Sequence, residues 1–214
     1  MSIRPKFITV EGGEGVGKTT QMRVIQACLE GAGVPVCVTR EPGGTPLGER
    51  LRDILLAAEP SLTPTPMAEL LLMFAARAQH VTTIIEPALE RGEWVLCDRF
   101  SDASFAYQGY GRGLPVATVE MLERITHPTL SPDLTILLDV DPKVGLERAR
   151  ERGDLDRFEV EASAFFERVR EGYLLRARDD PERWRIIDAR RSLPEVEVQI
   201  KDVLTDWLAS RERV

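Results

Sequence analysis

Short, nearly uninterrupted apolar runs recur along the chain, and longer segments of mixed polarity separate them. Runs of this kind, rich in Val, Ile and Leu, are typical of strands that are buried on both faces. The five runs are FITVE (7–11), VCVTR (36–40), WVLCD (94–98), LTILLDV (134–140) and WRIID (184–188). We therefore predict five buried strands.

Helical patterns fill most of the sequence between these strands. We expect helices over residues 17–31, 46–58, about 66–91, 115–126, 143–152, 161–178 and 194–210. Gly31 and Gly33 mark the end of the first helix. Apolar strands that alternate with helices indicate an α/β fold, in which a parallel five-stranded sheet is covered by helices on both faces.

The composition fits one compact domain that spans residues 1–214, because no Pro-, Gly- or Ser-rich tract is long enough to act as a linker. The chain carries 28 Lys and Arg residues against 35 Asp and Glu residues, a formal net charge of −7. This charge argues against a protein that holds a nucleic-acid polymer by its phosphate backbone. It leaves room for a local cationic pocket.

The cysteines and the N-terminal segment indicate the cellular compartment in which the protein works. Cys28, Cys37 and Cys97 lie in apolar or strand-like surroundings without CxxC spacing, so we expect buried free thiols in a reducing environment. The N-terminal segment leads directly into the first strand, and no apolar stretch reaches about 18 residues. We therefore expect a cytoplasmic protein that does not contact a membrane.

A glycine-rich segment, GGEGVGKTT, follows the first strand directly and matches the pattern G-x4-G-K-[ST] in the order strand, loop and helix. Glycines let backbone N–H groups curl around a phosphate, and the helix N-terminus adds its positive end. In such a loop Lys18 reaches the β- and γ-phosphates and Thr19 binds Mg²⁺. The predicted ATP-binding residues are Gly12, Gly13, Glu14, Gly15, Val16, Gly17, Lys18, Thr19 and Thr20.

The third predicted strand ends in Asp98, Arg99 and Phe100. These residues fall at the carboxyl edge of the sheet beside the glycine loop, where ligands bind in folds of this kind. Taken alone, such a triplet is more often a surface ion pair. Next to a phosphate-binding loop, Asp98 can hold the Mg²⁺ hydration shell and Arg99 can clamp a second phosphate. The chain has no NKxD tetrapeptide for reading guanine.

Arginine is concentrated in LERARERGDLDRF (146–158). Like charges one helical turn apart, such as Arg148 and Arg152, destabilise a helix by a few tenths of a kcal/mol, so another role must favour them. Phosphoryl transfer brings several negative charges together and depends on cations that stabilise the transferred group. We expect a mobile lid over about 148–160 with a hinge at Gly153. The alternative is a solvated helix whose arginines pair with neighbouring glutamates.

Six segments together resemble bacterial thymidylate kinase across nearly the whole chain. They are EGGEGVGKTT (11–20), REPGGT (40–45), LMFAAR (72–77), DRFSDASFAYQG (98–109), PDLTILLDV (132–140) and ERGDLDRFE (151–159). The resemblance implies a P-loop NTPase fold and transfer of the γ-phosphoryl group of ATP to dTMP with the help of Mg²⁺. It also suggests a homodimer whose substrates are small molecules.

By this resemblance, LMFAAR supplies the thymine site, in which Phe74 stacks on the base and Arg77 donates to a ring carbonyl. Met73 is the alternative wall, because the stacking Phe of many relatives lies four residues before the Arg, and Phe74 could instead be helix packing. Ser104 and Gln108 lie one helical turn apart, so both can face the base edge. The alternative for this pair is a solvated helix face.

Further implied roles concern the sugar and the phosphates. Glu14 resembles the acidic residue that meets the sugar 3′-hydroxyl, and Arg52 is placed for the monophosphate unless it is simply an exposed helix arginine. Some thymidylate kinases carry an arginine within the loop itself, where this chain has Gly15 and Val16. The cation must then come from the lid.

The expected site divides into three groups of residues. The substrate-binding group is Glu14, Glu41, Pro42, Arg52, Phe74, Arg77, Arg99, Ser104 and Gln108; the catalytic group is Lys18, Arg99, Arg148 and Arg152; and the metal-binding group is Thr19 and Asp98.

Two other functions remain open at this point. The first is a kinase for another nucleotide or a deoxynucleoside, which rates over a panel of acceptors would distinguish. The second is a P-loop switch or binding module, which would bind ATP without consuming it in the presence of any monophosphate.

Overall fold

The computed structural model describes residues 6–57, 59–151, 157–158 and 161–211. The strands are β1 (Phe7–Glu11), β2 (Val36–Arg40), β3 (Trp94–Asp98), β4 (Leu134–Asp139) and β5 (Trp184–Asp188). All five predicted strands are confirmed, and only β4 ends one residue early. The α-helices are α1 (Lys18–Gly31), α2 (Pro46–Leu56), α3 (Pro66–His80), α4 (Glu86–Glu90), α5 (Ser101–Ser104), α6 (Val116–Thr126), α7 (Pro142–Glu151), α8 (Ser163–Asp179) and α9 (Leu193–Arg211).

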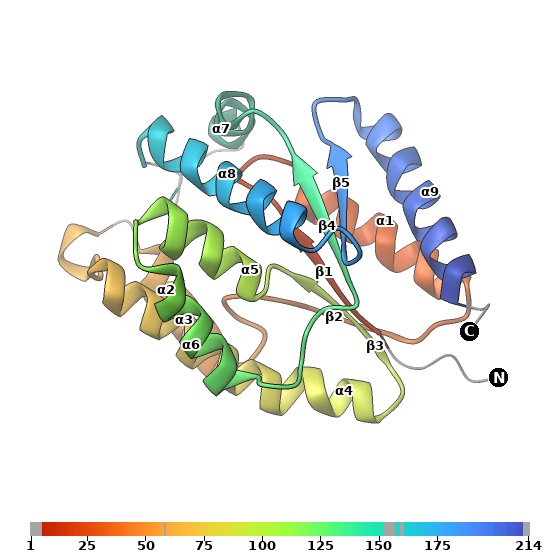
Figure 1. The fold of residues 1–214 in the computed structure, drawn as a ribbon, viewed down its shortest axis with the longest axis horizontal. Coiled ribbons are helices and arrows are strands. Elements are labelled where there is room, and N and C mark those ends of the chain that lie inside the picture. The colour runs from red at the N-terminus through yellow and green to blue at the C-terminus, as the bar shows by residue number, and fades with distance from the viewer. Residues whose placement is uncertain (1–5, 58, 152–156, 159–160, 212–214) are drawn as a thin grey trace.

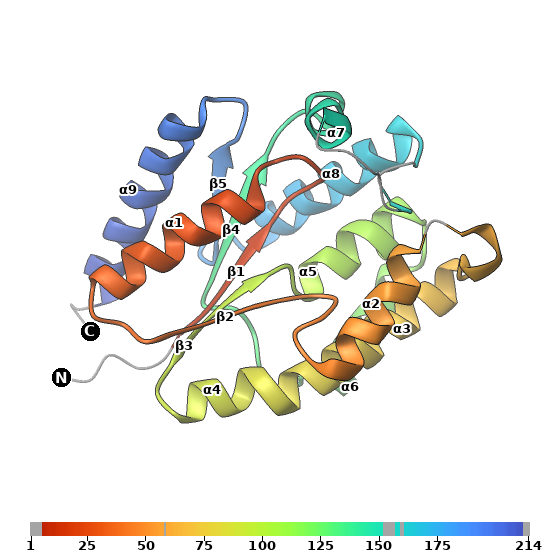
Figure 2. The same ribbon diagram turned by 180° about the vertical axis from the view of Figure 1, so that it is seen from behind.

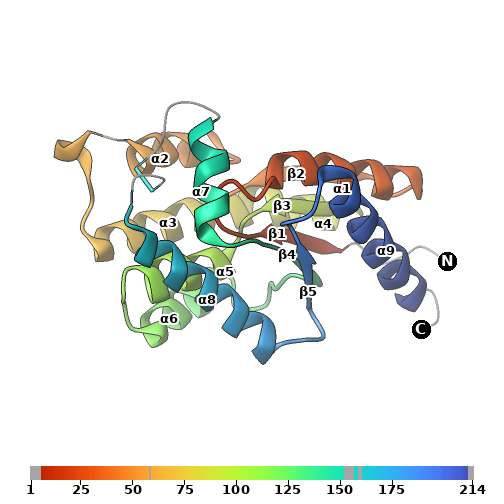
Figure 3. The same ribbon diagram turned by 90° about the horizontal axis from the view of Figure 1, so that it is seen from above.

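The strands form one parallel sheet in the order β2-β3-β1-β4-β5. Helices cover both of its faces. Figure 1 shows α8 in front of the sheet, and the view from behind in Figure 2 shows α1 in front of it. The view from above places α1 and α9 on one side and α5, α6 and α8 on the other (Figure 3). The predicted α/β architecture is therefore confirmed.

Alternation along β1 divides the core between these two layers. Ile8 and Val10 pack with the residues of α1 and α9, including Trp207. Phe7 points to the opposite face, where its ring meets that of Phe100 edge-on at 4.9 Å between centroids. Burial on both faces explains why this strand is apolar at almost every position.

Two helical regions differ from the sequence-based expectation. The predicted helix over about 66–91 consists of α3, a π-helical segment η2 (Val81–Ile85) and α4. The segment after β3, which the pattern leaves unassigned, forms α5 and a π-helical segment η3 (Phe105–Gly111). Nearly all of its side chains are buried, polar ones included, so it lacks the polar face that marks an amphipathic helix. A short 3₁₀ turn, η1 (Pro60–Leu62), precedes α3.

The parallel sheet places the carboxyl ends of its strands at a common edge. The glycine-rich loop leaves β1 there, and Asp98 and Arg99 lie at the end of the adjacent β3. Among the described residues, the helices lack the combination of length and apolar character that crossing a bilayer requires.

Candidate active site

The loop between β1 and α1 has the backbone of a phosphate cradle. Gly12, Gly15 and Gly17 have φ values of 143°, 65° and 90°, a region that favours glycine. A Cβ atom at Gly12 would lie 2.6 Å from the carbonyl oxygen of Leu138, and one at Gly15 would collide with the carbonyl oxygen of Gly145 in α7. The glycines therefore allow both the turn and its close packing against the neighbouring backbone.

Lys18 begins α1 and folds back over this loop. Its Nζ donates to the carbonyl oxygens of Gly12, at 3.2 Å, and Gly13, at 3.0 Å. Burial, followed by the nearby Arg99 guanidinium, lowers the pKa of Lys18 below its ordinary value. A phosphate in the loop would supply the negative charge that this cationic cluster needs.

Arg99 is held in an unusual conformation at the end of β3. Its φ of 67° is the only positive value among the non-glycine residues that the structure describes. Its Nη2 donates to Glu14 Oε1 at 2.7 Å, and its Nη1 donates to Gly12 O at 2.9 Å and to the Tyr173 hydroxyl at 3.1 Å. The guanidinium also lies 4.8 Å from the centre of the Tyr107 ring. A bulky residue keeps a left-handed backbone only where its surroundings enforce it, and such positions cluster at functional sites.

Arg99 remains strongly cationic. Burial lowers its pKa, but Tyr107, Glu14 and other neighbours outweigh burial, so that the pKa of Arg99 lies well above its usual value. The Tyr107 hydroxyl donates to the same Glu14 oxygen at 2.8 Å. Glu14 and Arg99 thus form a polar wall between the glycine loop and the space beside it.

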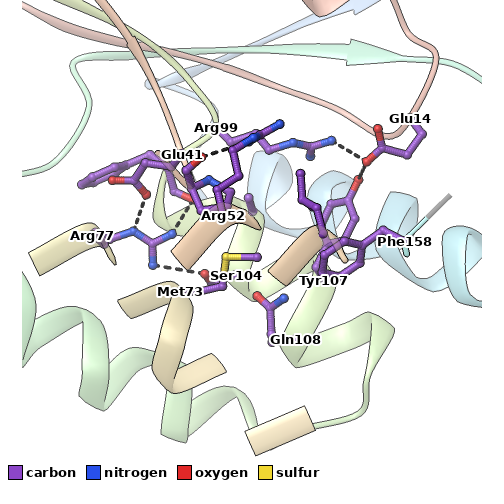
Figure 4. Close-up of a pocket in the computed structure, with 14 residues that line it drawn as sticks. Glu14, Glu41, Arg52, Met73, Arg77, Arg99, Ser104, Tyr107, Gln108 and Phe158 are labelled. Carbon is purple, nitrogen blue, oxygen red and sulfur yellow. Dashed lines mark hydrogen bonds and ion pairs between the residues drawn. The ribbon is translucent and has the colours of Figure 1, made fainter. Parts of the chain in front are cut away.

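A cavity lies against this wall on the side of the helices (Figure 4). Eight of the nine residues predicted to bind the acceptor line it: Glu14, Glu41, Pro42, Arg52, Arg77, Arg99, Ser104 and Gln108. They come from five separate segments of the chain. Leu56, Met73, Phe100, Ala103, Tyr107 and Phe158 complete the lining.

Phe74 does not line the cavity, and its placement corrects the preferred interpretation of LMFAAR. Its side chain is 3% exposed and packs with Leu70, Phe105 and Val119 in a separate core cluster. Successive helix residues point about 100° apart, so the neighbouring Met73 faces the cavity instead. The Phe74 ring supports Arg77, whose guanidinium carbon lies 4.4 Å from the ring centre.

Arg77 is fixed from three directions at the floor of the cavity. Its Nε donates to Glu41 Oε2 at 2.7 Å, Nη1 to Ser104 Oγ at 3.1 Å and Nη2 to Phe100 O at 3.1 Å. Three of its five N–H groups are engaged in this way, which leaves two for a ligand. Burial raises the pKa of Glu41, but Arg77 and His80 outweigh burial and lower it below the ordinary value.

His80 extends this network away from the cavity. Its Nδ1 lies 2.9 Å from Glu41 Oε1 and its Nε2 lies 2.6 Å from Thr39 Oγ1, and the ring is fully buried. His80 therefore fixes the carboxylate that holds Arg77. This is a structural role beside the site.

A second cavity lies over the glycine loop and is lined by cations. Its lining includes Lys18, Arg40, Arg52, Arg99 and Arg148. Arg52 reaches both cavities and donates from Nη1 to the carbonyl oxygen of Pro42 at 2.9 Å. The exposed-helix alternative for Arg52 is therefore disfavoured.

Thr19 and Asp98 line this second cavity together. Asp98 Oδ1 is buried, with no hydrogen-bond partner among the described residues. A carboxylate and a hydroxyl beside a phosphate cradle fit Mg²⁺, which is held by one or two carboxylates plus substrate phosphates rather than by an all-protein cage. In the described part of the chain, no group of three or more His, Cys, Asp or Glu side chains is placed to hold a metal.

The arginine-rich stretch is only partly described. Arg148 in α7 lines the cationic cavity and donates from Nη1 to Ala189 O at 3.0 Å. Arg152, which the sequence predicts as a catalytic residue of the lid, lies outside the described residues. Arg157 is buried, and its Nε donates to Leu55 O at 2.9 Å. This engagement points the Arg157 guanidinium into the α2–α3 region.

Sequence reasoning missed several residues of the site. Glu11, at the end of β1, is fully buried and accepts hydrogen bonds from Phe100 N and the Tyr173 hydroxyl, each at 2.8 Å. Tyr173 comes from α8, 74 residues beyond Arg99, and no local pattern connects the two. Tyr107 stands in the quoted DRFSDASFAYQG segment, and its spacing from Ser104 could have drawn attention to it.

Comparisons with known proteins agree on one family. A family model described as thymidylate kinase matches residues 10–200. A thymidylate kinase of Teredinibacter turnerae is 52% identical over 203 residues, which cover 95% of this chain and 98% of that one. The thymidylate kinase of Hahella chejuensis is also 52% identical, with 95% and 97% covered. The crystal structure of thymidylate kinase from Ehrlichia chaffeensis matches with a TM-score of 0.75 at 34% identity, covering 94% of this chain and 98% of the other.

Proposed function

The chain belongs to the thymidylate kinase family and has its P-loop NTPase fold, and from this we propose a role in the reaction for each residue of the site. The enzyme transfers the γ-phosphoryl group of ATP to dTMP, giving ADP and dTDP. A phosphate oxygen of dTMP forms a bond to the γ-phosphorus while the bond to the β,γ-bridging oxygen breaks. ADP leaves with that oxygen.

One observation carries the assignment of the two cavities. The acceptor cavity and the cationic cavity share Glu14, Glu41, Arg52 and Arg99 in their linings. A nucleoside monophosphate in the first cavity and ATP in the second would therefore present their phosphates to the same arginines. Catalysis of phosphoryl transfer consists mainly of such positioning and charge stabilisation.

On the donor side, residues 12–20 cradle the ATP phosphates and Lys18 contacts the β- and γ-phosphates. Thr19 and Asp98 hold Mg²⁺, which supplies positive charge to the phosphate oxygens when it is bound. Arg99 faces both nucleotides from the wall between the cavities. Arg148 contributes a further cation from α7.

On the acceptor side, Arg77 and Gln108 address the edge of the thymine ring, and Met73 packs against the ring. Glu14 meets the sugar 3′-hydroxyl, and Arg52 binds the monophosphate from α2. The strongly fixed Arg77 is suited to this task because a donor that is already oriented loses little entropy on binding.

We propose one kinase domain over residues 1–214, in which about 148–160 act as the lid and Arg152 joins Arg148 over the transferred group. We also propose that the protein works in the cytoplasm. The free cysteines are consistent with a reducing compartment.

A coupled ADP-release assay with Mg·ATP and each common nucleoside monophosphate tests the proposed acceptor site. We expect dTMP to be preferred over dCMP and dGMP. The hardest monophosphate to exclude should be dUMP, because it lacks only a methyl group, which changes the free energy of transition-state binding by only about 1–3 kcal/mol. Equal efficiency with purine monophosphates would refute the base site. ATP binding without turnover of any acceptor would indicate a switch instead.

Apolar side chains on two adjacent helices support a homodimer. Met67 and Leu71 on α3 are 41% and 50% exposed, and Met121 and Ile125 on α6 are 49% and 71% exposed. Each pair is spaced four residues apart and so lies on one helix face. Ile125→Asp should shift the protein to a monomer in sedimentation velocity. Ile186→Asp, at an exposed position on the edge strand β5, should leave the oligomeric state unchanged.

A further inference from the structure

A buried carboxylate on α3 lies beside the acceptor cavity without lining it. Glu69 is fully buried among apolar residues of its helix. Its Oε1 accepts from Gln108 Nε2 at 2.8 Å, and its Oε2 accepts from Arg157 Nη2 at 2.7 Å. Arg112 bridges both oxygens, with Nε 3.3 Å from Oε1 and Nη2 3.2 Å from Oε2. The Glu69 carboxylate therefore connects Gln108 in η3 with Arg157, the residue that precedes Phe158 on the cavity wall.

The chemistry of these partners fixes the orientation of Gln108. A carboxylate between two guanidinium groups accepts hydrogen bonds and donates none, so the amide of Gln108 must turn its NH₂ toward Glu69. This orientation leaves the carbonyl oxygen as the amide atom that can face a ligand in the cavity that Gln108 lines. Gln108 then offers an acceptor, while Arg77 offers donors (Figure 4).

This pattern discriminates between pyrimidines. Thymine and uracil carry an N3–H donor beside a C4 carbonyl acceptor, which complements the Gln108 carbonyl and the Arg77 guanidinium. Cytosine carries an N3 acceptor beside a C4 amino donor. Its N3 would face the Gln108 carbonyl, another acceptor, and its amino group would face the Arg77 guanidinium, another donor. A polar group left unpaired in a site rejects a misfitting ligand more strongly than an apolar contact does.

We propose that Glu69 is a positioning residue that sets the pyrimidine selectivity of the enzyme by holding the Gln108 amide in the orientation that presents its carbonyl to the base. The inference rests on the proposed acceptor site and adds a residue that never touches the substrate. Arg112 and Arg157 take part by donating the hydrogen bonds that fix the carboxylate in place.

The variant Glu69→Gln tests this directly because it replaces one oxygen by an NH₂ group. Oε2 accepts from Arg157 at 2.7 Å and from Arg112 at 3.2 Å, whereas the only guanidinium contact of Oε1 among the residues that the structure describes is the longer one from Arg112 at 3.3 Å. The new carbonyl is therefore expected at the Oε2 position, and the new NH₂ group faces Gln108. The Gln108 amide must then turn over and present its own NH₂ to the base. We expect the ratio of kcat/KM for dTMP to kcat/KM for dCMP to fall by about tenfold or more.

A matched control separates this effect from general destabilisation. Asp102 is also fully buried and also accepts from two arginines, Arg176 and Arg183, but it does not line the acceptor cavity. Asp102→Asn should lower the melting temperature and leave the dTMP to dCMP ratio within about twofold of the wild type. A ratio that changes equally in both variants would overturn the proposal.

A second variant keeps the proposal testable if Glu69→Gln fails to fold. The double variant Glu69→Gln with Gln108→Glu exchanges carboxylate and amide, keeps the number of buried charges and restores an acceptor toward the base. It should recover the preference for dTMP over dCMP. A folded double variant with the selectivity lost would contradict the inference. Wild-type turnover of dTMP, measured in the same series, tests the proposed acceptor site independently of Glu69.

Discussion

Replacing Glu11 by glutamine should stabilise the protein in alkaline solution and have little effect in mildly acidic solution. The Glu11 carboxyl is fully buried at the end of β1, beneath the glycine loop. Burial, and secondly the nearby Asp102, raise the pKa of Glu11 from 4.5 to about 8, although Arg99 and the hydrogen bonds from Tyr173 and Phe100 oppose this shift. Glutamine resembles the neutral form of the side chain at every pH.

The direction and size of this pH effect on stability follow from the difference between the pKa of Glu11 in the folded and unfolded states. Between the unfolded value of 4.5 and the folded value of about 8, the folded protein keeps a proton that the unfolded chain has released. The free energy of unfolding therefore falls as the pH rises through this window. At about 1.36 kcal/mol for each pKa unit, the Glu11 contribution falls by on the order of 5 kcal/mol in total.

Urea unfolding followed by tryptophan fluorescence, from about pH 5 to about pH 9, measures this contribution. The difference between Glu11→Gln and the wild type isolates residue 11, because the other titrating groups are common to both proteins. We expect the variant to gain stability relative to the wild type as the pH rises. Asp102→Asn is the contrasting control: burial raises the pKa of Asp102, but Arg183 and Arg176 outweigh it and hold that pKa below its usual value. This variant removes only the second of the causes that raise the pKa of Glu11, and burial, the largest, remains, so its gain should be smaller than that of Glu11→Gln. A difference that stays constant across the range would mean that Glu11 remains ionised in the fold.

Three further predictions concern the site itself. Lys18→Ala should abolish phosphoryl transfer and leave the circular dichroism spectrum unchanged, since Lys18 serves the phosphates; near-normal turnover would refute the phosphate-loop assignment. Met73→Ala should raise KM for dTMP with little change in melting temperature, whereas Phe74→Ala should lower the free energy of unfolding by about 3–5 kcal/mol because it leaves a core cavity; the reverse pattern would restore Phe74 as the base wall. Arg148→Ala should lower the rate of the chemical step, measured in single-turnover kinetics, by on the order of 10² with a smaller change in dTMP affinity. A rate of that step within a few-fold of the wild type would mean that Arg148 is only a surface charge.

The sheet could be predicted because its signals are local. Strands buried on both faces are apolar throughout, and the glycine loop and the Asp98–Arg99 pair follow two of them directly. The parallel arrangement then brings these segments to one edge by topology alone. The acceptor residues Arg77 and Gln108, which lie in α3 and η3, are instead named from the resemblance to thymidylate kinases.

The rest depends on contacts that no local pattern carries. In LLLMFAAR every position before the arginine is apolar, so periodicity could not tell Met73 from Phe74. Glu69 is a single acidic residue near the start of a helix, where a charge is ordinary. Its partners lie 39 to 88 residues away, and their convergence appears only in the folded chain.

The packing of Gly15 against Gly145 restricts how this enzyme can change over evolution. A Cβ atom at Gly15 would collide with the carbonyl oxygen of Gly145, and one at Gly145 would collide with the carbonyl oxygen of Glu14. An arginine could therefore enter the glycine loop at position 15 only after the first turn of α7 had moved away. The two positions are epistatic: the present position of α7 excludes any side chain at position 15, and a side chain at position 15 would require α7 to move. A lineage that keeps this backbone must therefore keep a residue without a side chain at both positions.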